Sequence, residues 1–134
     1  MTLMTITPQE IATKILDHRN QIFSQTGTLA DFMDTDLSGV ALTGEFLPLA
    51  HFCGASLVNA NLSQSNLSSA SFRGTDLTGA DLSNGLIVHG CFANANLTNV
   101  NFSGATLVKA DFTGAITTGA NFAGADLTGA TGLP

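Results

Sequence analysis

The sequence predicts a solenoid, in which the chain winds into regular coils that stack on one another. A large apolar residue stands at every fifth position from Phe32 to Leu127, at 19 of 20 positions, with Thr117 as the exception. Neither an α-helix, with a period of about 3.6, nor a flat strand, with a period of about 2, keeps a five-residue repeat on one side. A fixed period without insertions therefore indicates a coil that returns to the same orientation.

The other positions of the repeat agree with such a coil. Two residues before the large apolar residue, alanine stands at 12 of the 20 positions, which indicates a second inward position with room for a methyl group. Two residues after it, glycine or asparagine stands at 14 of the 20 positions, and both tolerate the backbone angles of tight turns. The positions directly before and after are often Asp or Asn and Ser or Thr, which suits a solvated outer surface.

These motifs resemble those of the pentapeptide-repeat family. The family pattern A-(D/N)-(L/F)-X-X is present as A-D-F-M-D at 30–34, A-N-L-S-Q at 60–64, A-D-L-S-N at 80–84 and A-N-F-A-G at 120–124. The match covers about 100 of the 134 residues. The resemblance implies an all-β fold, a right-handed quadrilateral β-helix in which four pentapeptides make one square coil. It also implies that the large apolar residue and the residue two before it point inward.

Sorting the large apolar residues at 20-residue spacing checks the four-sided coil independently. One of the four resulting columns contains only phenylalanine, and these residues form the predicted structural core: Phe32, Phe52, Phe72, Phe92 and Phe112. Such a column is expected if aromatic rings stack on one face, and it gives about five coils. Thr117 interrupts the neighbouring leucine column, so its hydroxyl should need a partner inside the coil, most simply a backbone carbonyl.

One domain is expected at this length, in three parts: an N-terminal cap over 1–29, the repeat over 30–131 and a tail over 132–134. Thr7, Pro8 and Glu10 are typical of a helix start, as N-cap, first helical residue and closing residue of a capping box. We expect a helix over roughly 8–23 that covers the first coil, with Gly27 marking an end. A helix on a membrane surface is the less favoured alternative, because its two bases are balanced by two acids.

The C-terminal end carries no comparable cap, since the repeat continues to Leu127 and then decays toward Pro134. An uncapped coil edge exposes backbone groups that invite pairing. We therefore predict a homodimer in which the C-terminal coils of two chains stack. The family resemblance agrees, because some members dimerise end to end.

One face of the predicted coil is less polar than the others. Its candidate interface residues surround the fourth column and are Phe46, Pro48, Leu49, Leu86, Val88 and Val108. Exposed apolar clusters often mark interfaces, so this face is expected to bind an unknown protein partner. The alternative is a local bulge at 45–49, because Pro48 cannot donate to a ladder, with Phe46 partly covered by the N-terminal helix.

No constellation of residues suggests catalysis, since the sequence has no base paired with a nucleophile and no phosphate-binding loop. We expect a non-enzymatic protein without cofactor or metal; His51, Cys53 and His89 are too few for a metal site. Cys53 and Cys91 would lie two coils apart, beyond disulfide reach. A coil this narrow is filled by its own side chains, so no pocket is expected.

The net charge of −6 lies entirely on the repeat, which holds eight acids and two bases. Such a coil does not suit direct binding to nucleic-acid phosphates. DNA mimicry is the alternative, because the repeat is similar to that of the quinolone-resistance pentapeptide proteins, acidic rods that occupy the DNA groove of type II topoisomerases. Matching DNA over a rod of roughly 24 Å would take about 14 negative charges, which favours a solubilising surface instead.

The sequence lacks a signal-peptide pattern and a long apolar span, so we expect a cytoplasmic protein without membrane contact. The predicted function is a pentapeptide-repeat structural or protein-interaction module of unassigned biochemical role. The alternative is an acidic DNA mimic that binds a type II topoisomerase and protects or inhibits it.

Overall fold

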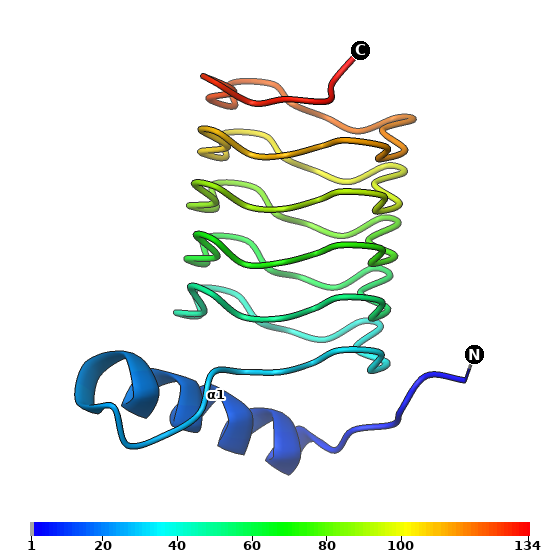
Figure 1. Cartoon of the computed structure of the whole chain (residues 1–134). Coiled ribbons are helices and arrows are strands. Elements are labelled where there is room, and N and C mark those ends of the chain that lie inside the picture. Colours follow the sequence, from blue (N-terminus) through cyan, green and yellow to red (C-terminus); the bar gives the residue numbers. More distant parts are fainter. Residues whose placement is uncertain (1) are drawn as a thin grey trace.

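The computed structural model describes residues 2–134 as a stack of coils with one helix, α1 (Pro8–Ser24), across its N-terminal end (Figure 1). Parallel bridges join residues that are 20 positions apart, such as Asp31 with His51 and His51 with Ser71. This ladder continues to the bridge between Asp111 and Thr131. Four pentapeptides therefore make one coil, as the sorting at 20-residue spacing predicts.

The coils are held together by single-residue bridges, and the described residues contain no longer strand. Each side of the coil is too short for a longer strand, because part of every pentapeptide forms a turn. Each turn is closed by a hydrogen bond to the carbonyl of the large apolar residue from the amide three residues later, as from Val40 to Leu37 at 3.1 Å. The result is a β-helical solenoid without regular strands.

The residue two after the large apolar residue has a positive φ in every pentapeptide, ten times in a glycine and ten times in another residue. This explains the preference for glycine and asparagine, which accept that conformation at low cost. The side chain of Asn99 also lies where a Cβ on Gly119 of the next coil would stand. Asparagine in one coil thus favours glycine directly above it.

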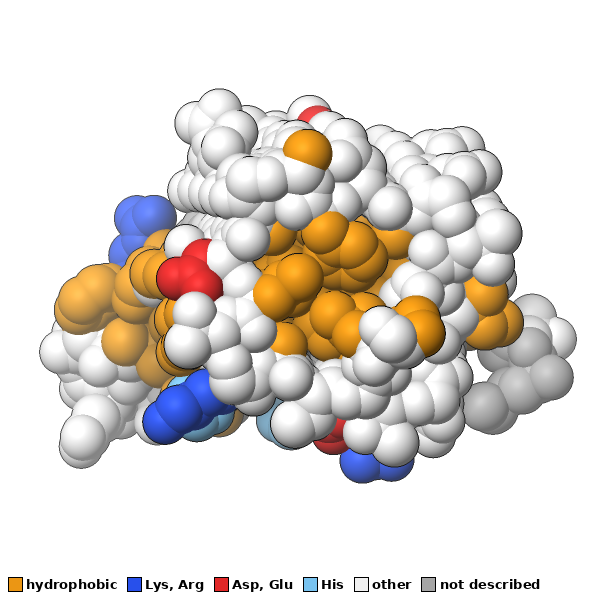
Figure 2. Space-filling model, turned by 90° about the horizontal axis from the view of Figure 1, so that it is seen from above, with side chains coloured by type: hydrophobic (Ala, Val, Ile, Leu, Met, Phe, Trp, Pro, Cys, Tyr) orange, Lys and Arg blue, Asp and Glu red, His pale blue; other side chains and the backbone are white. Residues whose placement is uncertain are grey.

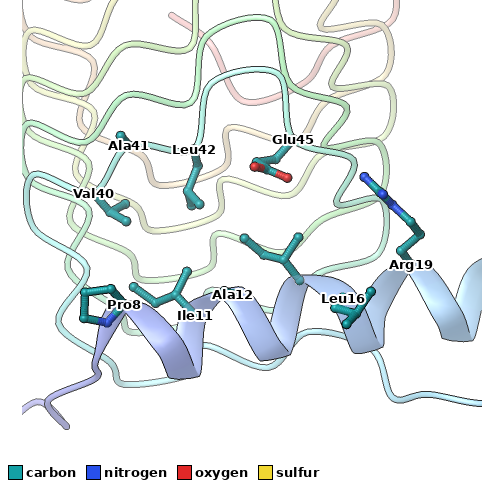
Figure 3. Close-up of a pocket in the computed structure, with 10 residues that line it drawn as sticks. Pro8, Ile11, Ala12, Leu16, Arg19, Val40, Ala41, Leu42 and Glu45 are labelled. Atoms are coloured by element: carbon teal, nitrogen blue, oxygen red, sulfur yellow. The ribbon is translucent and has the colours of Figure 1, made fainter.

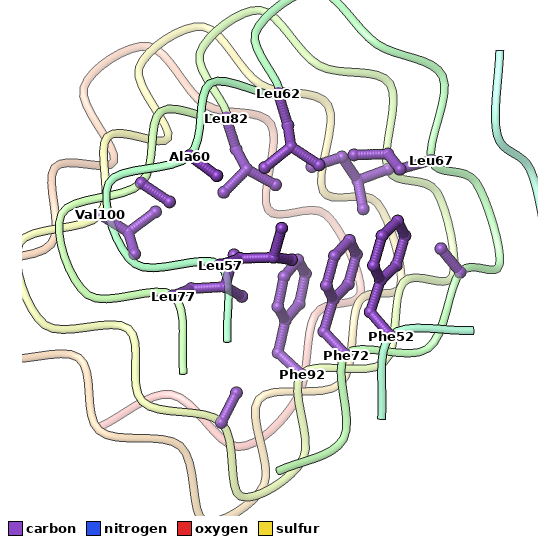
Figure 4. Packing of buried hydrophobic residues seen from close by; sticks show 14 of the residues in the cluster. Phe52, Leu57, Ala60, Leu62, Leu67, Phe72, Leu77, Leu82, Phe92 and Val100 are labelled. Atoms are coloured by element: carbon purple, nitrogen blue, oxygen red, sulfur yellow. The ribbon is translucent and has the colours of Figure 1, made fainter. Parts of the chain in front are cut away.

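The interior of the stack is filled by buried apolar side chains. The five core phenylalanines are fully buried, and the rings of Phe52, Phe72 and Phe92 are stacked with centroids 5.0 Å apart and interplanar angles of 2° and 3° (Figure 4). A second aromatic column starts at Phe102, whose ring meets that of Phe92 edge-on at 86°. Each buried ring contributes about 1.5–3 kcal/mol by removing apolar surface from water, so the column stabilises coil-on-coil stacking.

The start of α1 follows the capping box predicted from the sequence. Thr7 Oγ1 accepts a hydrogen bond from the Glu10 amide at 3.1 Å, and Glu10 Oε2 accepts one from the Thr7 amide at 2.9 Å. Pro8 occupies the first turn, where its missing N–H costs nothing. The helix ends at a left-handed cap on Gln25, with φ 56°, so Gly27 lies beyond the end that it was expected to mark.

The bulge at 45–49, which was the alternative to an interface on this face, is wrong, because Leu47 and Leu49 donate regular hydrogen bonds to the carbonyls of Asn66 and Ser68 at 2.8 and 2.9 Å. Pro48 stands directly after the large apolar residue Leu47. In no coil does the amide at this position take part in the hydrogen bonds between coils. Where Asp or Asn precedes the large apolar residue, that amide bonds to its side chain, as at Asp31. Phe46 offers no such acceptor, so a proline at this position loses no hydrogen bond.

Candidate functional site

The N-terminal end of the stack is covered by α1 and the segment before it. Ile11 and Ile15 pack against the core, and Lys14 Nζ lies 5.9 Å from the centroid of the Phe32 ring. The Met4 amide donates to Asp34 and the Met4 carbonyl accepts from Asp36, both at 2.8 Å. The first coil therefore has a partner for part of its lower edge.

His18 fixes α1 to the coil and is fully buried. Its Nδ1 accepts a hydrogen bond from the Ala30 amide at 2.9 Å, and Nε2 faces the Pro48 carbonyl without a regular hydrogen bond within residues 2–134. Burial lowers the pKa of His18 below its usual 6.5, while the Pro48 carbonyl acts in the opposite direction. This residue was not identified from the sequence, although its spacing from Ile11 and Ile15 places it on the apolar side of α1.

The C-terminal end has no covering helix within the described residues, and from the tail only the Leu133 side chain packs against the core. In the coil below, the Phe102 amide donates to Asn121 at 2.7 Å, whereas the amides of Phe122 and Leu127 find no partner in residues 2–134. Both side chains are only half-buried. Figure 2, which views the stack from this end, shows apolar side chains gathered in its middle inside a ring of other atoms. The end is thus apolar at its centre and carries free backbone donors around it.

Thr117 also belongs to this last coil and is half-exposed. The predicted bond from its hydroxyl to a buried carbonyl is absent from residues 2–134. The expectation fails because the column ends here, so the hydroxyl is not enclosed by a further coil.

The candidate interface residues do not form one continuous patch. Leu49 and Leu86 are 46% and 43% exposed, and the other four, Phe46, Pro48, Val88 and Val108, are half-buried. The bridge ladder places Asn66 between Phe46 and Leu86. The ring of Phe46 stacks on Phe23 of α1 with centroids 5.3 Å apart, which confirms the partial cover by the helix. Phe23 itself remains 69% exposed and was not identified from the sequence as an interface residue.

The outer acids are held by the turns that they precede. Hydrogen bonds from the Ser38 amide lower the pKa of Asp36, and those from the hydroxyls of Thr113 and Thr128 lower the pKa of Asp111 and Asp126. These carboxylates therefore stay ionised at neutral pH. Among the bridged residues that face outward, however, no column has acids in two consecutive coils.

Other chemistry-bearing residues lie apart from one another. Cys53 and Cys91 are free thiols. In residues 2–134, no group of three His, Cys, Asp or Glu side chains could hold a metal ion. The same part of the chain contains no helix long and apolar enough to cross a membrane.

The expectation that the protein has no pocket is wrong at the N-terminal end. A cavity of about 590 Å³ lies between α1 and the first coil, beside Ile15, Leu42 and Glu45. The interior of the coils is filled as expected, but α1 does not close the whole of the first coil. Sequence periodicity could not reveal this gap, because it depends on where the helix crosses the coil.

Comparison with known proteins agrees with the geometry. The family model "Pentapeptide repeats" matches residues 47–84 and 95–131 with eight copies. A pentapeptide repeat protein of the Arabidopsis thaliana thylakoid lumen is 38% identical, with a TM-score of 0.58, over 74% of this chain and 67% of that one. No curated protein matches the chain significantly.

Two further solved structures are more distant. A pentapeptide repeat protein (Rfr23) of the cyanobacterium Cyanothece 51142 is 19% identical over 87% of this chain and 94% of that one, with a TM-score of 0.45. QnrB1, a plasmid-mediated fluoroquinolone resistance protein, is 24% identical over 75% of this chain and 64% of that one, with a TM-score of 0.35. With the family model matching more than half of the sequence and the coil showing its 20-residue ladder, this chain belongs to the pentapeptide repeat family.

Proposed function

We propose that this chain is a non-enzymatic structural and protein-interaction module, built as a right-handed four-sided β-helix, whose first partner is a second copy of itself. The observation that carries this proposal is the difference between its ends: α1 covers the first coil, whereas the last coil presents half-buried Phe122 and Leu127 and unbonded amides. An apolar surface surrounded by backbone donors is suited to pairing with another chain.

The exposed edge is complementary to itself. In the coils below, alanine carbonyls accept bonds from the next coil, as Ala105 does from Asp126 at 2.9 Å. The corresponding carbonyl of Ala125 has no such donor in residues 2–134, and it lies in sequence between the unbonded amides of Phe122 and Leu127. Donors and acceptors therefore alternate along the edge, as a symmetric contact between two identical surfaces requires.

Sedimentation of two variants tests this proposal. Phe122→Asp places a charge in the centre of the C-terminal end, and we expect it to sediment as a monomer. Ile116→Asp is the matched control, because Ile116 belongs to the same coil but points outward with 52% exposure. The control should remain dimeric. Equal masses for both variants, with coil structure retained by circular dichroism, would reject the C-terminal interface.

The ionised outer carboxylates support one alternative function, the acidic DNA mimic that binds a type II topoisomerase. Asp36, Asp111 and Asp126 are fixed in position by their turns, which favours a defined pattern of negative charge. A gyrase supercoiling assay with and without the protein separates the two functions. Absence of both inhibition and drug protection at micromolar protein would reject the mimic and leave the module.

A further inference from the structure

The cavity at the N-terminal end is a groove between α1 and one side of the first coil (Figure 3). Ile11, Ile15 and Leu16 line it from the helix, and Val40 and Leu42 line it from the coil. Its volume of about 590 Å³ is within the range of protein ligand sites. Most of its wall is apolar, and the two charged side chains that line it are Arg19 and Glu45.

Glu45 is an unusual residue for its position in the repeat. It stands two residues before Leu47, where alanine is most frequent, and it is the only ionisable residue at that position in the 20 repeats. Its amide donates to the buried Ser65 hydroxyl at 3.1 Å, which holds the backbone of Glu45 against the next coil. Its carboxylate forms no hydrogen bond or ion pair within residues 2–134, although Arg19 extends from α1 toward the same end of the groove (Figure 3). The groove therefore contains a half-buried anion that an occupant can neutralise.

The groove also borders an open backbone edge. On the neighbouring side of the coil, the Asp36 amide donates to the carbonyl of Met4, so an extended segment already lies beneath that side. Ala41 is the equivalent residue five positions later, lines the groove and is exposed. Its amide and carbonyl have no partner in the described residues. The pairing at Met4 shows the geometry that a second extended segment would adopt.

We propose that this groove binds an extended segment of a partner protein. The segment pairs with the Ala41 backbone, inserts a large apolar side chain between Ile15 and Leu42, and places a basic side chain against Glu45. Strand addition of this kind takes affinity from backbone hydrogen bonds and specificity from alternate side chains. A fatty acid fits less well, because its carboxylate would lie in the same groove as the Glu45 carboxylate and it has no donor for the Ala41 carbonyl.

The probe is a fluorescein-labelled peptide, T-V-T-L-T-K-T, in which leucine and lysine face the same side of an extended chain. We expect saturable binding by fluorescence anisotropy with a Kd of about 10–100 μM. Glu45→Gln should weaken binding about tenfold, but it should not change the affinity of the peptide with threonine in place of lysine. Leu16→Asp, at an exposed residue that lines the groove, should weaken the binding of both peptides.

Two controls make the result decisive. Leu86→Asp lies on a side face away from the groove and should bind the peptide as the wild type does. Glu45→Gln should leave the dimer mass unchanged, so a failure here is distinct from a failure of the C-terminal interface. The proposal is overturned if no saturable binding occurs at about 1 mM peptide, if both groove variants bind normally, or if only a long-chain fatty acid binds.

Discussion

The two ends of the coil stack contain the same kind of residue in different surroundings. Phe32 in the first coil is fully buried at the end that α1 covers, with Lys14 Nζ over the face of its ring. Phe122 in the last coil stacks on Phe102 on one side, at 5.1 Å, and is half-exposed on the other. Both phenylalanines occupy the same position of the repeat, and they differ because α1 covers only the first coil.

This difference shows that a five-residue repeat specifies a coil but not how the coil ends. A solenoid gains stability from contacts between neighbouring repeats, so its terminal repeats need a cover or a partner. Here α1 is the cover at one end, and we propose a second copy as the partner at the other. The two ends should therefore differ in stability as they do in structure.

The largest effect is expected from removing a ring at each end. Phe32→Ala should lower the free energy of unfolding by about 3–5 kcal/mol, because it leaves a cavity in a closed core. Phe122→Ala should cost clearly less in the monomer, because its ring is only partly buried. Urea unfolding at a protein concentration where the chain is monomeric measures both. Equal losses would mean that the C-terminal end is as closed as the N-terminal end.

A second prediction concerns the open coil itself. Gly119 and Gly124 both have φ +71°, but the Asn99 side chain lies beneath the first and Gly104 beneath the second. Gly124→Ala should cost about 1–2 kcal/mol for the left-handed backbone alone. Gly119→Ala should cost about 1 kcal/mol more, since Asn99 must move.

The double variant Gly119→Ala with Asn99→Gly separates these two contributions in urea unfolding. It should recover the extra loss and leave only the backbone cost. No difference between the two single variants would show that the last coil is too loose for the ladder to matter there.

The cap should respond to pH through His18. Its pKa is lowered in the folded protein, so the unfolded chain binds the proton more readily. The contribution of His18 to the free energy of unfolding is therefore complete above pH 6.5. It is lost as the pH falls through 6.5 toward the lower pKa of the folded protein, by at most about 1.4 kcal/mol per pH unit. Protonation would put a donor on Nδ1 opposite the Ala30 amide.

Hydrogen exchange of the Ala30 amide at pH 7.5 and pH 5.5 measures this effect, after correction for the intrinsic rates. His18→Gln has no titrating group and should show no such change in protection between the two pH values. If wild type and variant behave alike, His18 does not link the cap to pH.

The smallest effects are expected on the side face. Leu86→Ser should change stability by less than about 0.5 kcal/mol, because Leu86 is 43% exposed. Phe46→Ser should cost more, since it removes the stack with Phe23 that joins α1 to the coil. Thermal unfolding compares the two variants, and pull-down with each tests the face for a partner. Unchanged partners with both variants would remove this face as an interface.

Much of the fold was predictable because it depends on local spacing. The period of five and the phenylalanine column at 20-residue spacing define the coil and its bridges, and Thr7, Pro8 and Glu10 define the start of α1. These features require only that each residue repeat the environment of an equivalent one, so sequence periodicity reveals them.

The features that were missed depend on how α1 crosses the first coil. The choice of Phe23 as the residue that covers Phe46 and the groove beside Glu45 both arise from that packing angle, which no periodicity encodes. His18 was missed although helical spacing from Ile11 and Ile15 places it on the apolar side of α1. The bulge at Pro48 was wrong for a different reason. The sequence shows that proline lacks an N–H, but not that the ladder leaves the N–H of that position unused.

The most direct test of the difference between the two ends is the solution mass of the unmodified protein by light scattering over a wide range of concentrations. One chain has a mass of 13.7 kDa. We predict a mass of about twice that value at high concentration, which falls toward one chain on dilution. A mass of one chain at every concentration would contradict the assignment of the uncovered C-terminal coil as a self-association surface.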